Sequence, residues 1–196
     1  MSIVAIILCG GRSSRMGTDK AHLPINGKRL VDHVADQINK AGIKDIVVSG
    51  EVRGLRCVAD DAPNGGPMVG FLSTIKEVYN EFDTFLVLPV DLPLLSKEAI
   101  KDLISQCIAK DAVFFENSPL PFIVRKSRLT KFDILSSSFA QCAPNLSVKK
   151  FLKLLDAQPL SLNDQLASGL TNTNTPEEWD RAKLKFDGAK TRQFAK

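Results

Sequence analysis

The chain has few of the residues that build disulfide frameworks, metal cages or histidine-based catalytic groups. It contains four cysteines and two histidines in 196 residues, and no Cys-x-x-Cys pair. The cysteines, at positions 9, 57, 107 and 142, are far apart, which favours a reducing cytoplasm over a disulfide-linked extracellular fold. No Ser-His-Asp or Cys-His arrangement is present, so covalent catalysis of that kind is not indicated.

Long hydrophobic runs, repeats and low-complexity segments are also missing. The apolar opening, residues 3–9, is much shorter than the roughly 20 residues of a membrane helix, and it lacks the basic start and cleavage site of a signal peptide. The net charge of +4 is small and comes from scattered cations, so it does not indicate a nucleic-acid or membrane partner, and we expect neither. With 196 residues, 44% of them hydrophobic, the chain can form one compact domain with a buried core. Together with the cysteine pattern, we expect it in the cytoplasm.

The most informative segment is the opening apolar run and the loop that follows it. Residues 3–9 are rich in β-branched side chains and predict a strand buried on both faces of a parallel sheet. Gly10 and Gly11 then allow the backbone to approach a ligand closely. Three cations, Arg12, Arg15 and Lys20, follow in a pattern that suits a polyphosphate.

Two better-known phosphate loops do not fit this segment. The Walker loop needs four residues between its glycines and a Ser or Thr after its lysine, whereas five residues separate Gly11 from Gly17 and Ala21 follows Lys20. The dinucleotide fingerprint needs alternate glycines, whereas Gly10 and Gly11 are adjacent. A plain Gly-Gly turn with solvated cations is the simpler alternative for the glycines alone.

Strand and helix signals alternate along the first half of the chain, which predicts an α/β fold with a mainly parallel sheet. The first expected helix is 28–41, which ends at Gly42. Apolar residues from Met68 to Val78 mark a second helix. A third is capped by Ser96 and has an apolar stripe at residues 100, 103, 104 and 108. Expected strands are 45–49, 55–60, 84–90, 112–116 and 122–125. Expected later helices are 127–136, 147–155 and one from Thr175 to about Lys185. We expect one domain over 1–185 and a frayed tail over 186–196.

Carboxylates and amides follow some of these elements. Asp91 ends a buried strand, where a Mg²⁺ ligand for a bound triphosphate would lie, although a turn residue beside Pro93 is the alternative. Asp60 ends another strand and could be an ordinary turn carboxylate. Asn172 and Asn174 precede the capping sequence of the last helix, and Asn174 could serve a metal or phosphates through its amide.

The segment from Leu8 to Lys20, Leu-Cys-Gly-Gly-Arg-Ser-Ser-Arg-Met-Gly-Thr-Asp-Lys, resembles the signature of the molybdenum cofactor guanylyltransferases, a family of the nucleotidyltransferase superfamily. The sequence around Asp91 is similar to the family's Pro-x-Asp-x-Pro, and residues 172–178 are similar to its Asn-x-Asn-Thr-Pro-Glu-Glu. Asp60 with the segment 65–70 resembles a further family motif. The resemblance covers most of residues 3–179 and implies a single-domain, three-layer α/β/α, Rossmann-like nucleotidyltransferase fold.

The resemblance implies transfer of GMP from GTP to the phosphate of a molybdopterin-type cofactor, with release of pyrophosphate. It implies catalytic roles for Arg15, Lys20 and Asp91, with Asp91 holding Mg²⁺. It implies a GTP site and a weaker phosphate or acceptor site. The GTP site is formed by Leu8, Cys9, Gly10, Gly11, Lys20, Ser49, Asp60 and Asp91, and the weaker site by Arg12, Asn172 and Asn174. Cofactor-delivery proteins or molybdoenzyme chaperones are the protein partners that it allows.

Two departures from the family pattern leave alternatives open. Ser49 stands where members tend to have an asparagine that touches guanine, and Ser147-Val148-Lys149-Lys150 replaces an expected basic pair near the acceptor. A related transferase that uses CTP or a sugar phosphate is therefore one alternative. A GTP-binding partner protein without catalysis is another, although Lys20 and Asp91 argue against it.

Overall fold

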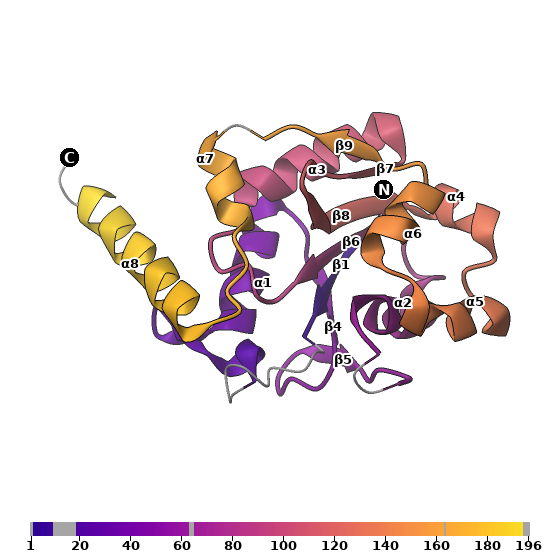
Figure 1. The fold of residues 1–196 in the computed structure, drawn as a ribbon, viewed down its shortest axis with the longest axis horizontal. Helices are drawn as coiled ribbons and strands as arrows, with labels where there is room; N and C mark the ends of the chain where they lie inside the picture. The colour runs from indigo at the N-terminus through magenta and orange to yellow at the C-terminus, as the bar shows by residue number, and fades with distance from the viewer. Residues whose placement is uncertain (1, 10–18, 63–64, 163, 194–196) are drawn as a thin grey trace.

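A seven-stranded sheet forms the centre of the molecule, in the order β5-β4-β1-β6-β8-β7-β9 (Figure 1). The computed structural model describes every residue except 1, 10–18, 63–64, 163 and 194–196. The strands of this sheet are β1 (Ile3–Leu8), β4 (Asp45–Ser49), β5 (Arg56–Val58), β6 (Thr84–Pro89), β7 (Ala112–Phe115), β8 (Ser118–Arg125) and β9 (Gln158–Leu160). Two short strands, β2 (Pro24–Ile25) and β3 (Lys28–Arg29), form a separate antiparallel pair.

The sheet is mainly parallel, as the sequence predicts. The pairs β1–β4, β1–β6, β4–β5 and β7–β9 are parallel, and β8 runs antiparallel to both β6 and β7. The strands β1, β4, β6 and β7 therefore end at the same edge of the sheet. Ligands of open α/β sheets bind at this edge.

Helices cover both faces of the sheet and complete the three layers (Figure 1). The α-helices are α1 (Leu30–Ala41), α2 (Pro67–Val78), α3 (Lys97–Lys110), α4 (Lys126–Leu129), α5 (Ser137–Cys142), α6 (Val148–Leu154), α7 (Asp164–Ala167) and α8 (Pro176–Gln193). Short 3-10 turns are η1 (Lys20–His22), η2 (Thr130–Phe132), η3 (Ala143–Asn145) and η4 (Ser168–Leu170). One hydrophobic cluster joins α1, α3 and Trp179 of α8 to one face, and a second joins α2 and α6 to the other.

The helices next to the site begin and end where the local chemistry requires. In α1, Leu30, Val34 and Ile38 recur at helical spacing and are at most 1% exposed, and Gly42 ends the helix with a left-handed φ of 106°. In α2, Gly66 precedes the helix with φ of 85°, and Pro67 occupies its first turn. These helices lie on opposite faces of the sheet and pack against the strands that carry the site.

Several expected boundaries are wrong. The single helix expected over 127–136 is replaced by α4 and η2, because Asp133 adopts a left-handed conformation and Ser136 begins α5 as its cap. On α3, Ile108 is 62% exposed, and Cys107 takes the buried position of the stripe instead. The helix expected to end near Lys185 continues to Gln193, and Phe186 packs against His33 of α1.

Candidate functional site

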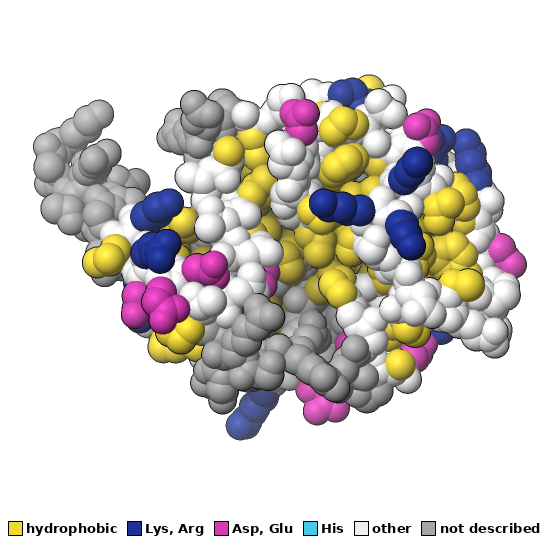
Figure 2. Space-filling view, viewed as in Figure 1, with side chains coloured by type: hydrophobic (Ala, Val, Ile, Leu, Met, Phe, Trp, Pro, Cys, Tyr) yellow, Lys and Arg dark blue, Asp and Glu magenta, His cyan; other side chains and the backbone are white. Residues whose placement is uncertain are grey.

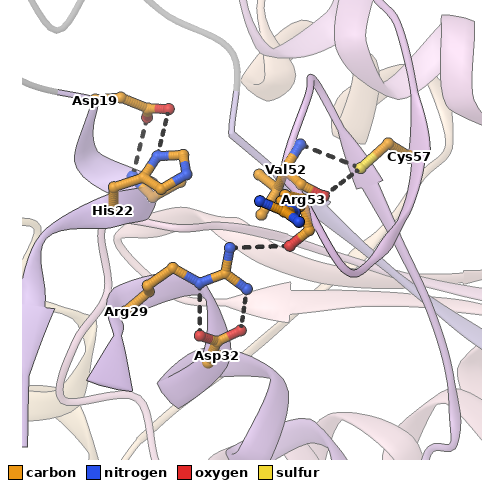
Figure 3. Close-up of polar contacts among 8 residues, drawn as sticks. Asp19, His22, Arg29, Asp32, Val52, Arg53 and Cys57 are labelled. Atoms are coloured by element: carbon orange, nitrogen blue, oxygen red, sulfur yellow. Dashed lines mark hydrogen bonds and ion pairs between the residues drawn. The ribbon is translucent and has the colours of Figure 1, made fainter. Parts of the chain in front are cut away.

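Lys20 is held in place by a cap on its own short helix. Asp19 precedes η1, and its carboxylate accepts hydrogen bonds from the backbone N–H of Ala21 at 3.0 Å and from Nδ1 of His22 at 3.0 Å (Figure 3). Such a cap satisfies a backbone donor that the start of a helix would leave unpaired. In the Asp-Lys pair of the sequence signature, Asp19 therefore caps the short helix that begins at Lys20.

The Lys20 ammonium joins two other predicted site residues that are distant in sequence. Nζ of Lys20 lies 3.0 Å from Oδ2 of Asp91 and 2.6 Å from Oδ1 of Asn174, across separations of 71 and 154 residues. The side chains of Lys20 and Asp91 are each 16% exposed. Pairing in such a site is stronger than at the surface, because less water screens the charges.

The second carboxylate oxygen of Asp91 fits a metal ion. Oδ1 of Asp91 is buried and has no hydrogen-bond partner among the residues that the structure describes. A buried anionic oxygen of this kind is costly unless something binds it. In the described part of the chain, no cluster of three or more His, Cys, Asp or Glu could hold a metal. A Mg²⁺ ion needs only one or two carboxylates when phosphates and water complete its shell, so Asp91 suits Mg²⁺ carried with a nucleotide.

The segment before α8 binds to the turn that carries Asp91. The backbone N–H and the hydroxyl of Thr173 both donate to the carbonyl of Asp91, at 3.1 and 3.3 Å. Oε2 of Glu178 accepts from the N–H groups of Asn174 and Thr175, at 2.6 and 3.1 Å, and the hydroxyl of Thr175 accepts from the N–H of Glu178. The predicted capping box is thus confirmed, and it also holds Asn174 against Lys20. Asn172 is exposed, and the contact to Lys20 comes from Asn174.

Ser49 and Asp60 form a second pair at the end of the neighbouring strand. The Ser49 hydroxyl donates to Oδ1 of Asp60 at 2.5 Å, and Ser49 is 1% exposed. Gly70 of α2 lies directly against this pair, and a Cβ atom there would overlap the Ser49 hydroxyl and lie 3.2 Å from Asp60. The last glycine of the segment 65–70 is therefore needed for close approach, a role that the sequence analysis missed. In the sequence, this role of Gly70 was indicated only by its place shortly after Gly66 and Pro67, at the start of the same helix.

Leu8 and Cys9 lie between the two pairs. The N–H of Cys9 donates to the carbonyl of Ser49 at 3.0 Å, and the carbonyl of Leu8 accepts from the N–H of Val90 at 3.1 Å. Burial raises the pKa of the Cys9 thiol far above its ordinary value, and the carboxylates of Asp19 and Asp60 add to the effect. Cys9 is therefore a neutral thiol, and it contributes backbone groups rather than a nucleophile.

Arg29 ties α1 to the loop between β4 and β5 on the same side of the site (Figure 3). Its guanidinium donates to both carboxylate oxygens of Asp32 at 2.7 Å and to the carbonyl of Arg53 at 2.9 Å. This fork holds the pKa of Asp32 below its usual range. The same loop is held to β5, where Sγ of Cys57 accepts from the N–H of Val52 and donates to its carbonyl. The sequence analysis did not identify these supports.

A cavity of about 470 Å³ lies between α6 and the β7–β8 turn. Phe114 and Leu152 contribute apolar walls, and Lys149 and Lys153 contribute charge. Figure 2 shows Lys and Arg side chains beside hydrophobic surface over α6 and the neighbouring strands. Residues 147–150 stand where the family pattern has a basic pair near the acceptor. Ser147 caps α6 there, and its hydroxyl accepts from the N–H of Lys150 at 3.2 Å.

Four predicted site residues, Gly10, Gly11, Arg12 and Arg15, lie outside the described residues. The predictions for them stay predictions. All four cysteines are free, as the sequence spacing predicts. Among the described residues, none of the helices combines the length and the apolar character needed to cross a membrane.

Comparison with known proteins assigns the chain to a family. The family profile described as MobA-like NTP transferase domain matches residues 5–155. The molybdenum cofactor guanylyltransferase of Xanthomonas euvesicatoria pv. vesicatoria is 33% identical over 180 residues, which cover 90% of this chain and 92% of that protein.

Solved structures agree on the fold. Molybdopterin-guanine dinucleotide biosynthesis protein A from Archaeoglobus fulgidus superposes with a TM-score of 0.69 at 17% identity, covering 94% of this chain and 99% of that one. A nucleotidyl transferase from Methanothermobacter thermautotroptrophicus superposes with a TM-score of 0.72 at 16% identity, covering 96% and 99%. The family profile and the Xanthomonas relative show that the chain is a nucleotidyltransferase and belongs to the MobA-like NTP transferase family.

Proposed function

We propose that the protein transfers GMP from GTP to the phosphate of a molybdopterin-type cofactor. The observation that carries the proposal is the contact of Lys20 with Asp91 and Asn174, at the sheet edge where one oxygen of Asp91 is buried and unpartnered within the described chain. A triphosphate needs a cation and a metal ligand side by side. The similarity to the Xanthomonas guanylyltransferase supports guanine as the base and the molybdenum cofactor as the acceptor.

The proposed reaction needs no general base on the protein. The acceptor phosphate has a second pKa of about 6, so it is already anionic at neutral pH. One of its oxygens attacks the α-phosphorus of GTP, a new P–O bond forms, and the bond to the β-phosphate breaks to release pyrophosphate. The protein's task is to align the two phosphates and to offset their charge.

Each site residue has a role in this alignment. Lys20 binds the phosphates and, with Arg15, the leaving pyrophosphate. Asp91 would hold Mg²⁺, which would supply positive charge to the triphosphate when bound. Gly10 and Gly11, for which the prediction comes from the sequence, would lie under the nucleotide together with the backbone of Cys9.

The base is bound further along the sheet edge, next to Leu8. Ser49 and Asp60 are the polar side chains that face it. We expect GTP to be preferred over CTP and ATP by about tenfold or more in kcat/KM, each tenfold being ~1.4 kcal/mol. The preference is reduced because Ser49 has a shorter side chain than the asparagine of the family pattern.

The cavity beside α6 is the proposed acceptor pocket. Its volume of about 470 Å³ lies within the range of small-molecule sites. It opens next to the end of β7, which is parallel to β6 and ends at the same edge as Asp91. Lys149 and Lys153 suit an anionic acceptor, and Phe114 and Leu152 suit a flat ring system.

A pyrophosphate-release assay with GTP, CTP, ATP and UTP, each with molybdopterin-type acceptor, tests the proposal. Asp91→Asn should lose ~10²-fold or more in turnover while the protein stays folded. Asp36→Asn is the matched control, since Asp36 pairs with Lys28 at the surface of α1. Equal use of CTP and GTP would assign a cytidylyltransferase instead, and GTP binding without pyrophosphate release would assign a non-catalytic binding protein.

The acceptor pocket needs its own test. Lys149→Ala and Lys153→Ala should raise the KM for the acceptor and leave the KM for GTP unchanged. Lys150→Ala is the control on the same helix, because Lys150 is exposed and does not line the cavity. If all three variants behave alike, the acceptor binds elsewhere.

A further inference from the structure

The turn that carries Asp91 is fixed to the core by its apolar side chains. After β6 the chain turns at residues 91–95, and the N–H of Leu95 donates to the carbonyl of Leu92 at 3.1 Å. Leu92 and Leu95 are 1% and 3% exposed. These contacts anchor the turn, but they do not set the orientation of its polar groups.

His33 of α1 fixes one of those polar groups. The imidazole is 9% exposed, and Nε2 donates to the carbonyl of Pro93 at 3.1 Å. Pro93 is two residues after Asp91 and has no backbone N–H, so its carbonyl is the group through which another element can hold it. A buried hydrogen bond of this kind restrains a turn more than an exposed one, because no water can replace the donor.

The segment from η4 to α8 holds the same turn from the other side. Thr173 donates twice to the carbonyl of Asp91. Gly169 packs so closely that a Cβ atom there would lie 2.8 Å from the carbonyl oxygen of Leu94. Phe186 of α8 also contacts the His33 ring edge to face, with centroids 5.0 Å apart. The imidazole is therefore fixed between the turn and α8.

We propose that His33 is a positioning residue that sets the orientation of the Asp91 carboxylate by holding the carbonyl of Pro93. The inference rests on the proposed function, in which Asp91 is a metal and nucleotide ligand. His33 touches neither substrate nor metal in this role. It acts through the turn, and Phe186 keeps its ring in place.

Two kinds of substitution separate positioning from packing. His33→Gln keeps an N–H donor at a reach similar to that of Nε2, whereas His33→Asn is polar but too short and His33→Leu has no donor. Thermal denaturation first establishes that each variant is folded. If the Leu variant does not fold, the Asn variant alone tests the loss of the hydrogen bond to Pro93. Kinetics are then measured well below the melting temperature.

Hydrogen exchange tests the hold on the turn without any substrate. The amides of Leu92, Leu94 and Leu95 should exchange at least about tenfold faster in the Asn and Leu variants than in wild type, and His33→Gln should restore protection. Equal exchange in all variants would overturn the proposal. This readout remains decisive even if the protein proves not to transfer nucleotides.

Transferase kinetics test the consequence for Asp91. The Asn and Leu variants should lose about tenfold or more in kcat with Mg²⁺ and GTP, since misplacement of a catalytic group by about 1 Å can cost 10²-fold. The KM for the acceptor should stay unchanged, and His33→Gln should stay within about threefold of wild type. An inactive wild type would refute the proposed function, whereas an active wild type with unaffected Asn and Leu variants would refute the positioning role.

Discussion

Replacing Lys20 by methionine removes the charge that joins Asp91 to Asn174 and keeps the length of the side chain. Nζ of Lys20 is 3.0 Å from Oδ2 of Asp91, and both side chains are 16% exposed. At that distance and an effective dielectric of about 20, the gross attraction is ~5 kcal/mol, most of which offsets desolvation. Exposed pairs are worth up to about 1 kcal/mol, and breaking a fully buried pair costs about 3–5 kcal/mol. We therefore expect Lys20→Met to cost ~2 kcal/mol.

A double-mutant cycle measures this coupling in the ligand-free protein. Lys20→Met should lower the melting temperature by about 4–8 °C, given about 2–4 °C per kcal/mol for a chain of this size. Adding Asp91→Asn should recover part of the loss, because the unpaired carboxylate is then gone. Lys28→Met is the control, since Lys28 pairs with Asp36 at the surface, and it should leave the melting temperature nearly unchanged.

Mg²⁺ adds a second readout to the same cycle. In Lys20→Met, Oδ2 of Asp91 loses its partner and Oδ1 already has none, so Mg²⁺ should raise the melting temperature of this variant more than that of wild type. Asp91→Asn should show no such rise. Strict additivity of the two substitutions, or equal Mg²⁺ shifts in all variants, would refute the reasoning.

Three further substitutions test the supports of the site. Gly70→Ala should displace the Ser49 hydroxyl from Asp60 and lower the free energy of unfolding by about 1–3 kcal/mol. It should raise the KM for GTP more than it lowers kcat. Unchanged GTP affinity in calorimetry would contradict this expectation. Glu178→Ala should lower the free energy of unfolding in urea by about 1–2 kcal/mol, because the N–H groups of Asn174 and Thr175 lose their acceptor. Asn174 is then held less firmly, so turnover should fall as well. A loss of stability with full turnover would limit Glu178 to capping. Burial lowers the pKa of His33, so the unfolded chain takes up the proton first, and stability should fall with pH from about 6.5 downward by up to ~1.4 kcal/mol per pH unit. His33→Gln should flatten that slope in urea titrations at pH 7.5, 6.5 and 5.5, and equal slopes would show that other groups cause it.

The position of Asp91 was predictable because a local pattern decides it. The apolar run before it predicts a buried strand, and a parallel sheet brings the ends of such strands to one edge. The same reasoning places Lys20 after β1 and Asn174 before a capped helix. The sequence does not contain the contact between them, which forms only when β1 pairs with β6 and residues 173–175 dock on the turn.

The supports of the site were not predictable, because each depends on a fit between distant elements. Gly70 reads as a small helical residue, and its need appears only when Ser49 and Asp60 lie against it. His33 stands among helical residues and from the sequence could be an ordinary surface or packing histidine, so neither its burial nor the bond to Pro93 could be predicted. The broken helix at 127–136 has a related cause, since the left-handed Asp133 is favoured by the surrounding turn and not by periodicity.

The two polar pairs of the site lie on either side of β1, so under the proposed function this one strand would serve both ends of a nucleotide. Its carbonyl at Leu8 bonds to the chain leading to Asp91, and its continuation at Cys9 bonds to Ser49. A ligand that bridges the pairs would bind only the folded sheet, because each pair takes its residues from different elements. If the proposed function holds, nucleotide binding is coupled to the docking of α8 through Asn174, and loosening of that helix would release Asn174 and Phe186 together.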